Sequence, residues 1–269
     1  MSGEKGGGRG AAGSPRAFLF DLDGTLYTDA GAIPGAVAAI AELRRRGLPV
    51  RFVTNTTRRS RRLLAERLAG YGIPARPEDV TTSVMGGVAL LRERGIRRVA
   101  AFVADATLED LKDFDLASPD PQAVMVGDLG DEWDFARLNR AFHFLMDGAE
   151  LIALHRDRYW LRGDGLALDA GPFVVALEFA TGKTAAVCGK PSAAFYRAAV
   201  AALGNRAPAS LRDVVMVGDD LWGDVQGAQA AGLTAWMVGT GKFREDALRE
   251  SGITPDRIVS SVAELPGLC

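Results

Sequence analysis

Short apolar runs alternate along the chain with longer segments whose apolar residues recur at helical spacing. Residues 17–21 (AFLFD) form an apolar run that ends at an acid, and residues 34–46 then carry apolar side chains three residues apart. Residues 48–54 (LPVRFVT) are a second strand candidate, and leucines recur over residues 63–68 in a second helix candidate. Strand, helix and strand in this order predict a parallel sheet with right-handed crossovers.

The pattern changes in the middle of the chain and then returns. We predict an amphipathic helix over residues 133–146, a short strand over 99–103, further strands over 151–154, 159–161 and 166–168, and a hairpin turn at residues 162–165. Beyond Gly189, strand and helix alternate again, with helices predicted over 192–203 and 224–231 and strands over 213–217, 234–238 and near 258. We therefore predict a core of residues 16–83 and 186–269 that is interrupted by an inserted domain of residues 84–185.

Composition is that of a globular protein with two lobes. The 269 residues are 48% apolar and 25% charged, which suits two cores better than one. Residues 1–15 are glycine-rich and have no apolar run, so we expect a flexible tail and no signal peptide. No stretch approaches the roughly 20 apolar residues that a membrane span needs. Two cysteines are too few for a disulfide framework, and we expect a reducing cytoplasm.

Charge gives no reason to expect binding to nucleic acid. Lys and Arg total 32 and Asp and Glu total 34, so the formal net charge is -2. Arginines gather at residues 44–46 and 58–62, where the neighbouring positions are apolar at helical spacing. We interpret both groups as solvated helix faces.

The strongest chemical signal follows the first predicted strand. Asp21 and Asp23 are two residues apart and are followed by Gly24, so both carboxylates can reach one cleft at the end of the strand. One of them could attack an electrophile while the other transfers protons. The alternative is a simple turn, since Asp and Gly favour turns in any case.

Companion residues at later strand ends favour a phosphoryl-transfer site. Thr54 and Asn55 offer a hydroxyl and an amide to anionic oxygens, and Lys190 supplies a fixed positive charge. The carboxylates of Asp21 and Asp219, with the backbone carbonyl of Asp23, would suffice as protein ligands of Mg²⁺. Each piece by itself also fits a loop or a cap, and the ordered set carries the prediction.

The ordered motifs resemble those of a known family. DLDGTL at residues 21–26, TN at 54–55, GKP at 189–191 and GDDxxxD at 218–224 are similar to motifs one to four of the haloacid dehalogenase superfamily. The insertion between the second and third motifs resembles that of its NagD-like subclass with a C2-type cap. The resemblance implies an α/β fold, with a Rossmann-like parallel-sheet core and an inserted α+β cap domain.

The resemblance also implies an activity and the residues that perform it. It implies a Mg²⁺-dependent phosphatase for small phosphate esters, phosphoramidates or pyrophosphate, acting through an aspartyl-phosphate intermediate. By this resemblance Asp21 is the nucleophile, Asp23 the general acid and base, Thr54, Asn55 and Lys190 the phosphate-binding residues, Asp21, Asp23 and Asp219 the metal ligands, and Asp220 and Asp224 residues that adjust the metal's waters. A phosphomutase or phosphotransferase, a dehalogenase and a regulatory protein without turnover remain alternatives.

Two features of the inserted domain stay open. The letters VMVGD occur at residues 124–128 and again at 215–219, and only the second copy is followed by further acids. We interpret Asp128 as a coincidental strand end, although a loop beginning there could face the cleft. His155, Arg158 and Tyr159 form a basic and aromatic cluster that either contacts a substrate's leaving group or is ordinary surface. The expected partners are a small phosphorylated substrate and, through the cap, a second copy of the chain.

Overall fold

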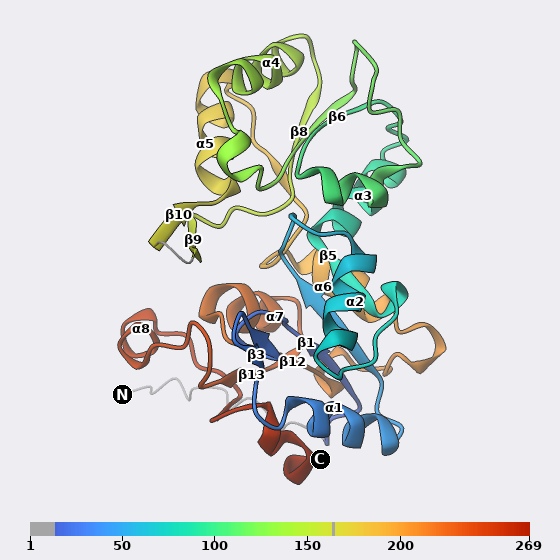
Figure 1. Ribbon diagram of the computed structural model, residues 1–269, viewed down its shortest axis with the longest axis vertical. Coiled ribbons are helices and arrows are strands. Elements are labelled where there is room, and N and C mark those ends of the chain that lie inside the picture. The colour runs from blue at the N-terminus through green and yellow to red at the C-terminus, as the bar shows by residue number, and fades with distance from the viewer. Residues whose placement is uncertain (1–13, 163–164) are drawn as a thin grey trace, which may run out of the picture.

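The computed structural model describes residues 14–162 and 165–269, arranged as two domains stacked end to end (Figure 1). The expected flexible tail, apart from its last two residues, and the centre of the turn at 162–165 lie outside the described residues. We call residues 14–82 and 188–269 the core domain and residues 83–187 the inserted domain. Among the described residues, no helix has the length and apolar character needed to cross a lipid bilayer.

A six-stranded parallel sheet forms the centre of the core domain. Its strands are β1 (Ala17–Phe20), β4 (Val50–Thr54), β5 (Val80–Thr82), β12 (Val214–Gly218), β13 (Thr234–Val238) and β14 (Arg257–Val259). Their order is β14-β13-β12-β1-β4-β5, and Phe18 of β1 pairs in register with Val50 and Val215. The central strand β1 is buried on both faces, as its unbroken apolar run predicts.

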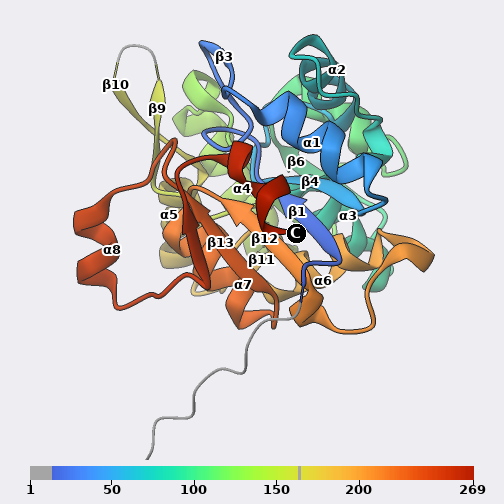
Figure 2. The ribbon, with the colours of Figure 1, turned by 90° about the horizontal axis from the view of Figure 1, so that it is seen from below.

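Helices cover both faces of this sheet (Figure 2). They are α1 (Ala36–Arg45), α2 (Arg61–Gly70), α6 (Ala193–Ala201) and the π-helical turn η6 (Leu221–Gln226) with α7 (Gly227–Ala230). Helix α8 (Glu245–Ser251) projects to the side of the sheet and has no buried residue. Phe18 and Phe20 point to the face covered by α1 and α2, whereas Leu19 packs on the other face with Phe195 of α6. The alternation of side chains along β1 therefore builds two apolar layers. A small antiparallel hairpin, β2 (Tyr27–Thr28) and β3 (Gly31–Ala32), follows the first motif.

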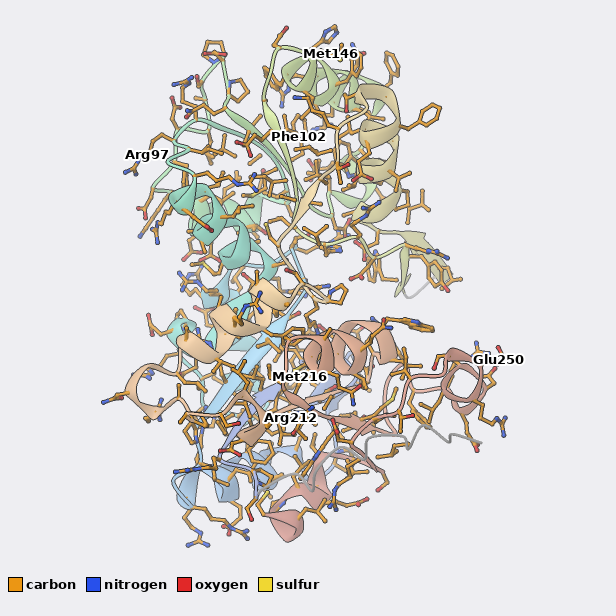
Figure 3. All side chains as sticks on the ribbon, turned by 180° about the vertical axis from the view of Figure 1, so that it is seen from behind. Arg97, Phe102, Met146, Arg212, Met216 and Glu250 are labelled. Atoms are coloured by element: carbon orange, nitrogen blue, oxygen red, sulfur yellow. The ribbon has the colours of Figure 1, made fainter. Side chains whose placement is uncertain are left out.

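The inserted domain has a four-stranded sheet of its own, which is also parallel. Its elements are α3 (Ser83–Glu93), β6 (Val99–Phe102), β7 (Ala123–Val126), α4 (Phe135–Met146), β8 (Glu150–Ala153), β9 (Tyr159–Arg162), β10 (Gly165–Leu168), α5 (Ala170–Thr181) and β11 (Ala186–Val187). The sheet order is β11-β8-β7-β6, and β9 and β10 pair as a separate antiparallel hairpin. Phe102 and Met146, labelled in Figure 3, lie in this domain, and Met216 lies in the core domain.

Short 3-10 turns complete the chain at η1 (Pro77–Asp79), η2 (Asp105–Leu111), η3 (Gly130–Glu132), η4 (Gly204–Arg206), η5 (Leu211–Asp213) and η7 (Val262–Leu268).

The structure differs from the sequence-based expectation in three places. The inserted domain ends two residues later than predicted, because β11 pairs with β8 of the second sheet and is too short to give a sequence pattern. Its main sheet alternates with helices as an α/β unit, and only the β9–β10 hairpin is antiparallel. The helix expected over residues 224–231 begins instead at Leu221 as a π-helical turn, with Asp220 as its N-cap.

The two sheets aim their carboxyl ends at the same region. The first motif follows β1, Asn55 follows β4 and Asp219 follows β12, while Asp128 follows β7 and His155 follows β8. Residues after these strand ends line one cavity between the domains. The active-site edge that an open parallel sheet normally presents to solvent is here covered by the matching edge of a second sheet.

Candidate active site

A buried lysine between two carboxylates forms the centre of the site. The Lys190 Nζ donates to Asp21 Oδ1 at 2.6 Å and to Asp224 Oδ1 at 2.5 Å. Asp21 is positioned by its own backbone, whose N–H continues the β1–β12 ladder to the carbonyl of Val217 at 2.9 Å. All three charged side chains are buried, and Lys190 is only 5% exposed. The geometry fixes one oxygen of Asp21 and leaves the other available for chemistry.

The carboxylates of this cluster resist ionisation in the absence of a metal. Burial raises the pKa of Asp21 to about 6, and Asp219 adds to the rise while Lys190 opposes it. Burial raises the pKa of Asp219 to about 7, with a further contribution from the nearby charge of Asp224. Asp224 has a pKa raised to about 7 for the same first reason. The pKa of Lys190 lies well above its ordinary value, because the two carboxylates outweigh its burial.

Asp21, Asp219 and Asp224 fit a divalent cation. Each offers one carboxylate oxygen, and these atoms lie within 4.8 Å of one another. Carboxylate oxygens are the donors that Mg²⁺ prefers, and mutual repulsion in a buried cluster is what a cation would relieve. The cluster could therefore hold a metal ion.

Two glycines shape the pocket around Asp219. Gly24 has φ +79°, and a Cβ there would lie 2.2 Å from Asp219 Oδ2. Gly241 has φ +64°, and a Cβ there would lie 2.0 Å from the same oxygen. The backbone N–H of Lys242 donates to Asp219 Oδ2 at 2.7 Å. Glycine is needed at both positions, since any side chain would displace the carboxylate.

Asp23 opens onto the cavity from the turn after β1. Its side chain is exposed, and desolvation by the surrounding protein still raises the pKa of its carboxyl while Arg67 and Arg59 oppose the rise. Arg67 is held over the ring of Tyr27 at 4.6 Å. A carboxyl group with a raised pKa at a cavity wall can donate and recover a proton.

Asn55 holds the lysine segment in place from the other side. Its Oδ1 accepts from the Lys190 backbone N–H at 2.8 Å, and its Nδ2 donates to the Lys190 carbonyl at 3.0 Å. The Ser83 hydroxyl in turn donates to the Asn55 carbonyl at 3.1 Å. Thr54 lines the cavity, and its Oγ1 accepts from the backbone N–H of Thr56 at 3.1 Å. The structure thus brings together the residues that the sequence predicts to bind phosphate.

The cavity between the domains has a volume of about 130 Å³. It is lined by Asp21, Asp23, Thr54, Asn55, Thr56, Thr57, Asp128, His155, Asp157, Asp169, Lys190, Asp220, Gly223 and Lys242. Asp219 and Asp224 are buried and do not line it. Arg158 and Tyr159 of the expected cluster are exposed and lie outside it, so only His155 of that cluster faces the site.

Asp128 is a correction to the sequence interpretation. It lines the cavity and is buried, with its backbone N–H donating to Thr57 Oγ1 at 2.8 Å. Its carboxylate accepts from Arg58 at 3.2 Å and from the backbone N–H of Gly130 at 2.7 Å. The repeat of VMVGD is therefore not a coincidence of strand composition, because each copy ends a strand whose carboxyl end faces the same cavity.

The arginines of residues 58–62 are also more than a solvated face. Arg58 pairs with Asp128, Arg61 with Asp110 at 3.1 Å, and Arg62 with Glu109 at 3.0 Å. Each pair joins the core domain to the inserted domain. Of the three, only the Arg62–Glu109 pair is exposed on both sides and contributes little free energy, whereas the carboxylates of Asp128 and Asp110 are nearly buried. Together the pairs orient one domain on the other.

Sequence reasoning missed Lys242, Asp157 and Asp169 as cavity residues. Lys242 Nζ lies 3.3 Å from Asp220 Oδ2, and the triplet Thr240-Gly241-Lys242 at the end of β13 is the signal that could have indicated it. Asp169 is the N-cap of α5, a signal of helix start that carries no information about a cavity. Their placement follows from the way the domains face each other.

Comparison with known proteins agrees with this geometry. Residues 18–117 match a model described as haloacid dehalogenase-like hydrolase, and residues 187–265 match a HAD-hydrolase-like model. Haloacid dehalogenase-like hydrolase domain-containing protein 2 from Homo sapiens is 41% identical over 240 residues, which cover 89% of each chain. The chain belongs to the haloacid dehalogenase-like hydrolase family.

Further relatives place the chain in the NagD-like subclass of these hydrolases. Phospholysine phosphohistidine inorganic pyrophosphate phosphatase from Homo sapiens is 37% identical over 256 residues, with 93% of this chain and 92% of the relative covered. NagD from the E. coli K-12 strain superposes with a TM-score of 0.82 at 28% identity, covering 93% of this chain and 98% of NagD. A p-nitrophenyl phosphatase from Archaeoglobus fulgidus gives 0.88 at 25% identity, covering 96% and 100%. The predicted Rossmann-like core with an inserted domain is confirmed.

Proposed function

We propose that this hydrolase is a Mg²⁺-dependent phosphatase that cleaves small phosphorylated substrates through an aspartyl-phosphate on Asp21. One observation carries the proposal: Lys190 holds Asp21 at 2.6 Å in a cavity that Asp23, Thr54 and Asn55 also line. Two of the similar proteins, the phospholysine phosphohistidine inorganic pyrophosphate phosphatase and the p-nitrophenyl phosphatase, are phosphatases by name.

The contacts of Asp21 orient it and favour its ionised form. Lys190 keeps Asp21 in one orientation and favours its ionised form against the cost of burial. The free oxygen of Asp21 attacks phosphorus, the bond from phosphorus to the leaving oxygen breaks, and Asp23 gives that oxygen its proton. Asp23 then takes a proton from water as the water oxygen attacks phosphorus, which releases phosphate and restores Asp21.

Phosphate recognition falls to residues at the ends of β4 and β11. The hydroxyl of Thr54, the backbone after it and the side chain of Asn55 face the cavity with the ammonium of Lys190. These groups can compensate the charge that spreads over the phosphoryl oxygens during transfer. The hydrogen bonds between Asn55 and the Lys190 backbone keep the donors in a fixed relation.

Metal binding is proposed at Asp21, Asp219 and the backbone carbonyl of Asp23, with Asp220 and Asp224 adjusting the metal's waters. Asp220 lines the cavity, and its Oδ1 accepts from the Trp222 and Gly223 backbone N–H groups, so its position is fixed by the start of η6. When bound, Mg²⁺ would offset the repulsion between the nucleophilic carboxylate and the phosphate.

The inserted domain is proposed to act as a C2-type cap that excludes water from the aspartyl-phosphate. Its contribution to the cavity wall and the small volume both favour a small-molecule substrate. A homodimer through this domain stays a prediction, which the exposed Phe135 and Phe179 on its surface favour. A reducing, cytoplasmic location also stays a prediction, and both cysteines are free thiols.

The test is phosphate release from p-nitrophenyl phosphate with Mg²⁺, with and without a chelator. We expect activity that requires Mg²⁺ and falls at least a thousandfold in Asp21→Asn, since loss of a nucleophile removes its step entirely. In the wild-type protein, phosphate label trapped on the chain by acid quench should be released by hydroxylamine, as an acyl phosphate is. Retained turnover in Asp21→Asn would refute the nucleophile.

A further inference from the structure

The inserted domain places four titratable side chains on the cavity wall opposite the nucleophile. Asp128, His155, Asp157 and Asp169 line the same cavity as Asp21. A phosphate bound at Asp21 would leave its substituent in the remaining part of about 130 Å³. The chemistry of this second wall therefore bears on the substrate's leaving group.

The carboxylates of this wall differ in the hydrogen bonds and ion pairs that the protein provides to each of them. Asp128 is neutralised by Arg58 at 3.2 Å. Asp157 accepts one hydrogen bond from Asn55 Nδ2 at 3.3 Å and is half-buried. Asp169 is 8% exposed, and its Oδ1 accepts from its neighbour's backbone N–H. Among the side chains that the structure describes, those of residues 14–160 and 165–269, none donates a hydrogen bond to Asp169 Oδ2.

Among the described residues, His155 is the basic side chain that contacts both Asp157 and Asp169, and Lys242 on the same cavity acts on Asp157 from farther away. The Nδ1 of His155 lies 3.4 Å from Asp157 Oδ2 and its Nε2 lies 3.5 Å from Asp169 Oδ1. One imidazole ring therefore faces two carboxylates, which outnumber the single positive charge that the ring can carry. Burial and the neighbouring carboxylates raise the pKa of Asp169, whereas the pKa of Asp157 is lowered to about 2 because the contact with His155 outweighs its burial.

His155 also has a buried nitrogen without a hydrogen bond, which indicates where a group of a bound ligand would lie. The residue is 2% exposed, and its Nδ1 makes no hydrogen bond within the described residues, since its 3.4 Å approach to Asp157 Oδ2 is not one. Buried polar atoms are nearly always satisfied, so a bound molecule is expected to supply the partner, and a hydroxyl can do so whether Nδ1 donates or accepts. One nitrogen of His155 and one oxygen each of Asp157 and Asp169 lie within 4.8 Å of one another, so a metal ion is the competing occupant of this wall.

We propose that the wall formed by His155, Asp157 and Asp169 selects small phosphorylated substrates whose leaving group carries a protonated amine. The proposal rests on the phosphatase function above and narrows its substrate class. A protonated amine near Asp157 and Asp169 gains charge-assisted hydrogen bonds to oxygens that the protein leaves under-compensated. An anionic leaving group, including the second phosphate of pyrophosphate, meets the same carboxylates as like charges.

The test uses three phosphate monoesters of equal length: 2-aminoethyl phosphate, 2-hydroxyethyl phosphate and phosphoglycolate, with p-nitrophenyl phosphate as reference. We expect kcat/KM to fall in the order ammonium, hydroxyl, carboxylate, by about tenfold or more at each step, because a charge-assisted hydrogen bond is worth this ratio. Asp157→Asn and Asp169→Asn should each reduce the ratio of ammonium to hydroxyl substrate by about tenfold. Asparagine can still cap α5 at position 169, so folding should survive.

Asp113→Asn is the matched control. It removes one negative charge from the same domain, where Asp113 pairs with Arg92 outside the cavity, and it should leave the substrate order unchanged. The inference is overturned if kcat/KM is equal for the ammonium and carboxylate substrates, or if the preference for the ammonium substrate survives in both wall variants. In either case, turnover of p-nitrophenyl phosphate still upholds the proposed phosphatase function. Loss of turnover on every substrate overturns both. A titration with Mn²⁺ that finds two ions per chain, and one in Asp169→Asn, would assign the wall to a metal instead and overturn the inference.

Discussion

Replacing Lys190 by methionine should destabilise the protein in a way that depends on pH. The substitution keeps most of the apolar stem of the side chain and removes the terminal ammonium group. Asp21 and Asp224 then remain buried without their shared partner. With Lys190 in place the pKa of Asp21 is raised to about 6 and that of Asp224 to about 7, so in the wild-type protein both ion pairs are formed at pH 8 and mostly lost to protonation at pH 5.

The size of the effect follows from the two contacts. Unit charges 2.6 Å apart attract by about 6 kcal/mol at an effective dielectric constant of about 20, and much of this is offset by the desolvation of the ions. Removing one partner of a buried ion pair costs about 3–5 kcal/mol. For a chain of this length such a change lowers Tm by about 5–10 °C. The expected loss is therefore about 5–10 °C at pH 8 and clearly less at pH 5.

The measurement is thermal unfolding followed by circular dichroism at pH 5 and pH 8, in a chelator so that no divalent ion compensates. Lys112→Met serves as control, because Lys112 is exposed and lies outside the cavity. It should change Tm by no more than 1–2 °C at either pH, as surface substitutions generally do. A fall in Tm for Lys190→Met that is the same at both pH values would show that packing, and not the ion pairs, accounts for the loss.

Two further predictions concern the metal cluster. Burial raises the pKa of Asp219 to about 7. Protonation of this group therefore stabilises the metal-free fold at low pH, and this stabilisation is lost as pH rises through about 7. We accordingly expect Mg²⁺ to raise Tm, measured by differential scanning fluorimetry, more at pH 8 than at pH 5.5. Gly24→Ala would place a Cβ 2.2 Å from Asp219 Oδ2. It should lower kcat/KM by about a hundredfold or more, which is the size of effect expected when reacting groups are misplaced. Gly47 has a similar positive φ but open space around it, so Gly47→Ala should keep its activity. Equal Mg²⁺ shifts at the two pH values, or equal activity of the two alanine variants, would contradict these expectations.

The core domain was largely predictable because its signals are local. The apolar run before Asp21 is a strand in the structure, and the acid follows it directly, so the position of the carboxylate at the sheet edge needed no long-range information. The same holds for Thr54 and Asp219, each at or directly after a strand. Two elements of the inserted domain were missed because they show no period: β11 has two residues, and the 12-residue helix α5 is apolar on nearly all sides.

The wall opposite the nucleophile was not predictable in the same way. Asp157 follows β8 after an irregular loop, and Asp169 looks like any helix cap in the sequence. Arg158 and Tyr159, which the sequence favoured for their chemistry, lie outside the cavity. Residue type indicated that this segment could contact a substrate, and the path of the loop decided which residues do.

The sequence by itself determined where the residues of the candidate site lie in the core domain, because Asp21, Asp23, Asn55, Lys190 and Asp219 each follow a strand end within a few residues of chain. Only the tertiary structure decided what that chemistry is applied to. Two parallel sheets face each other by their carboxyl ends, and no local pattern contains this relation. It makes the first VMVGD strand end, at Asp128, and the acids beyond β8 the other wall of one cavity. Contacts within a few residues are fixed by local propensity, whereas contacts across two domains depend on how complete apolar layers pack.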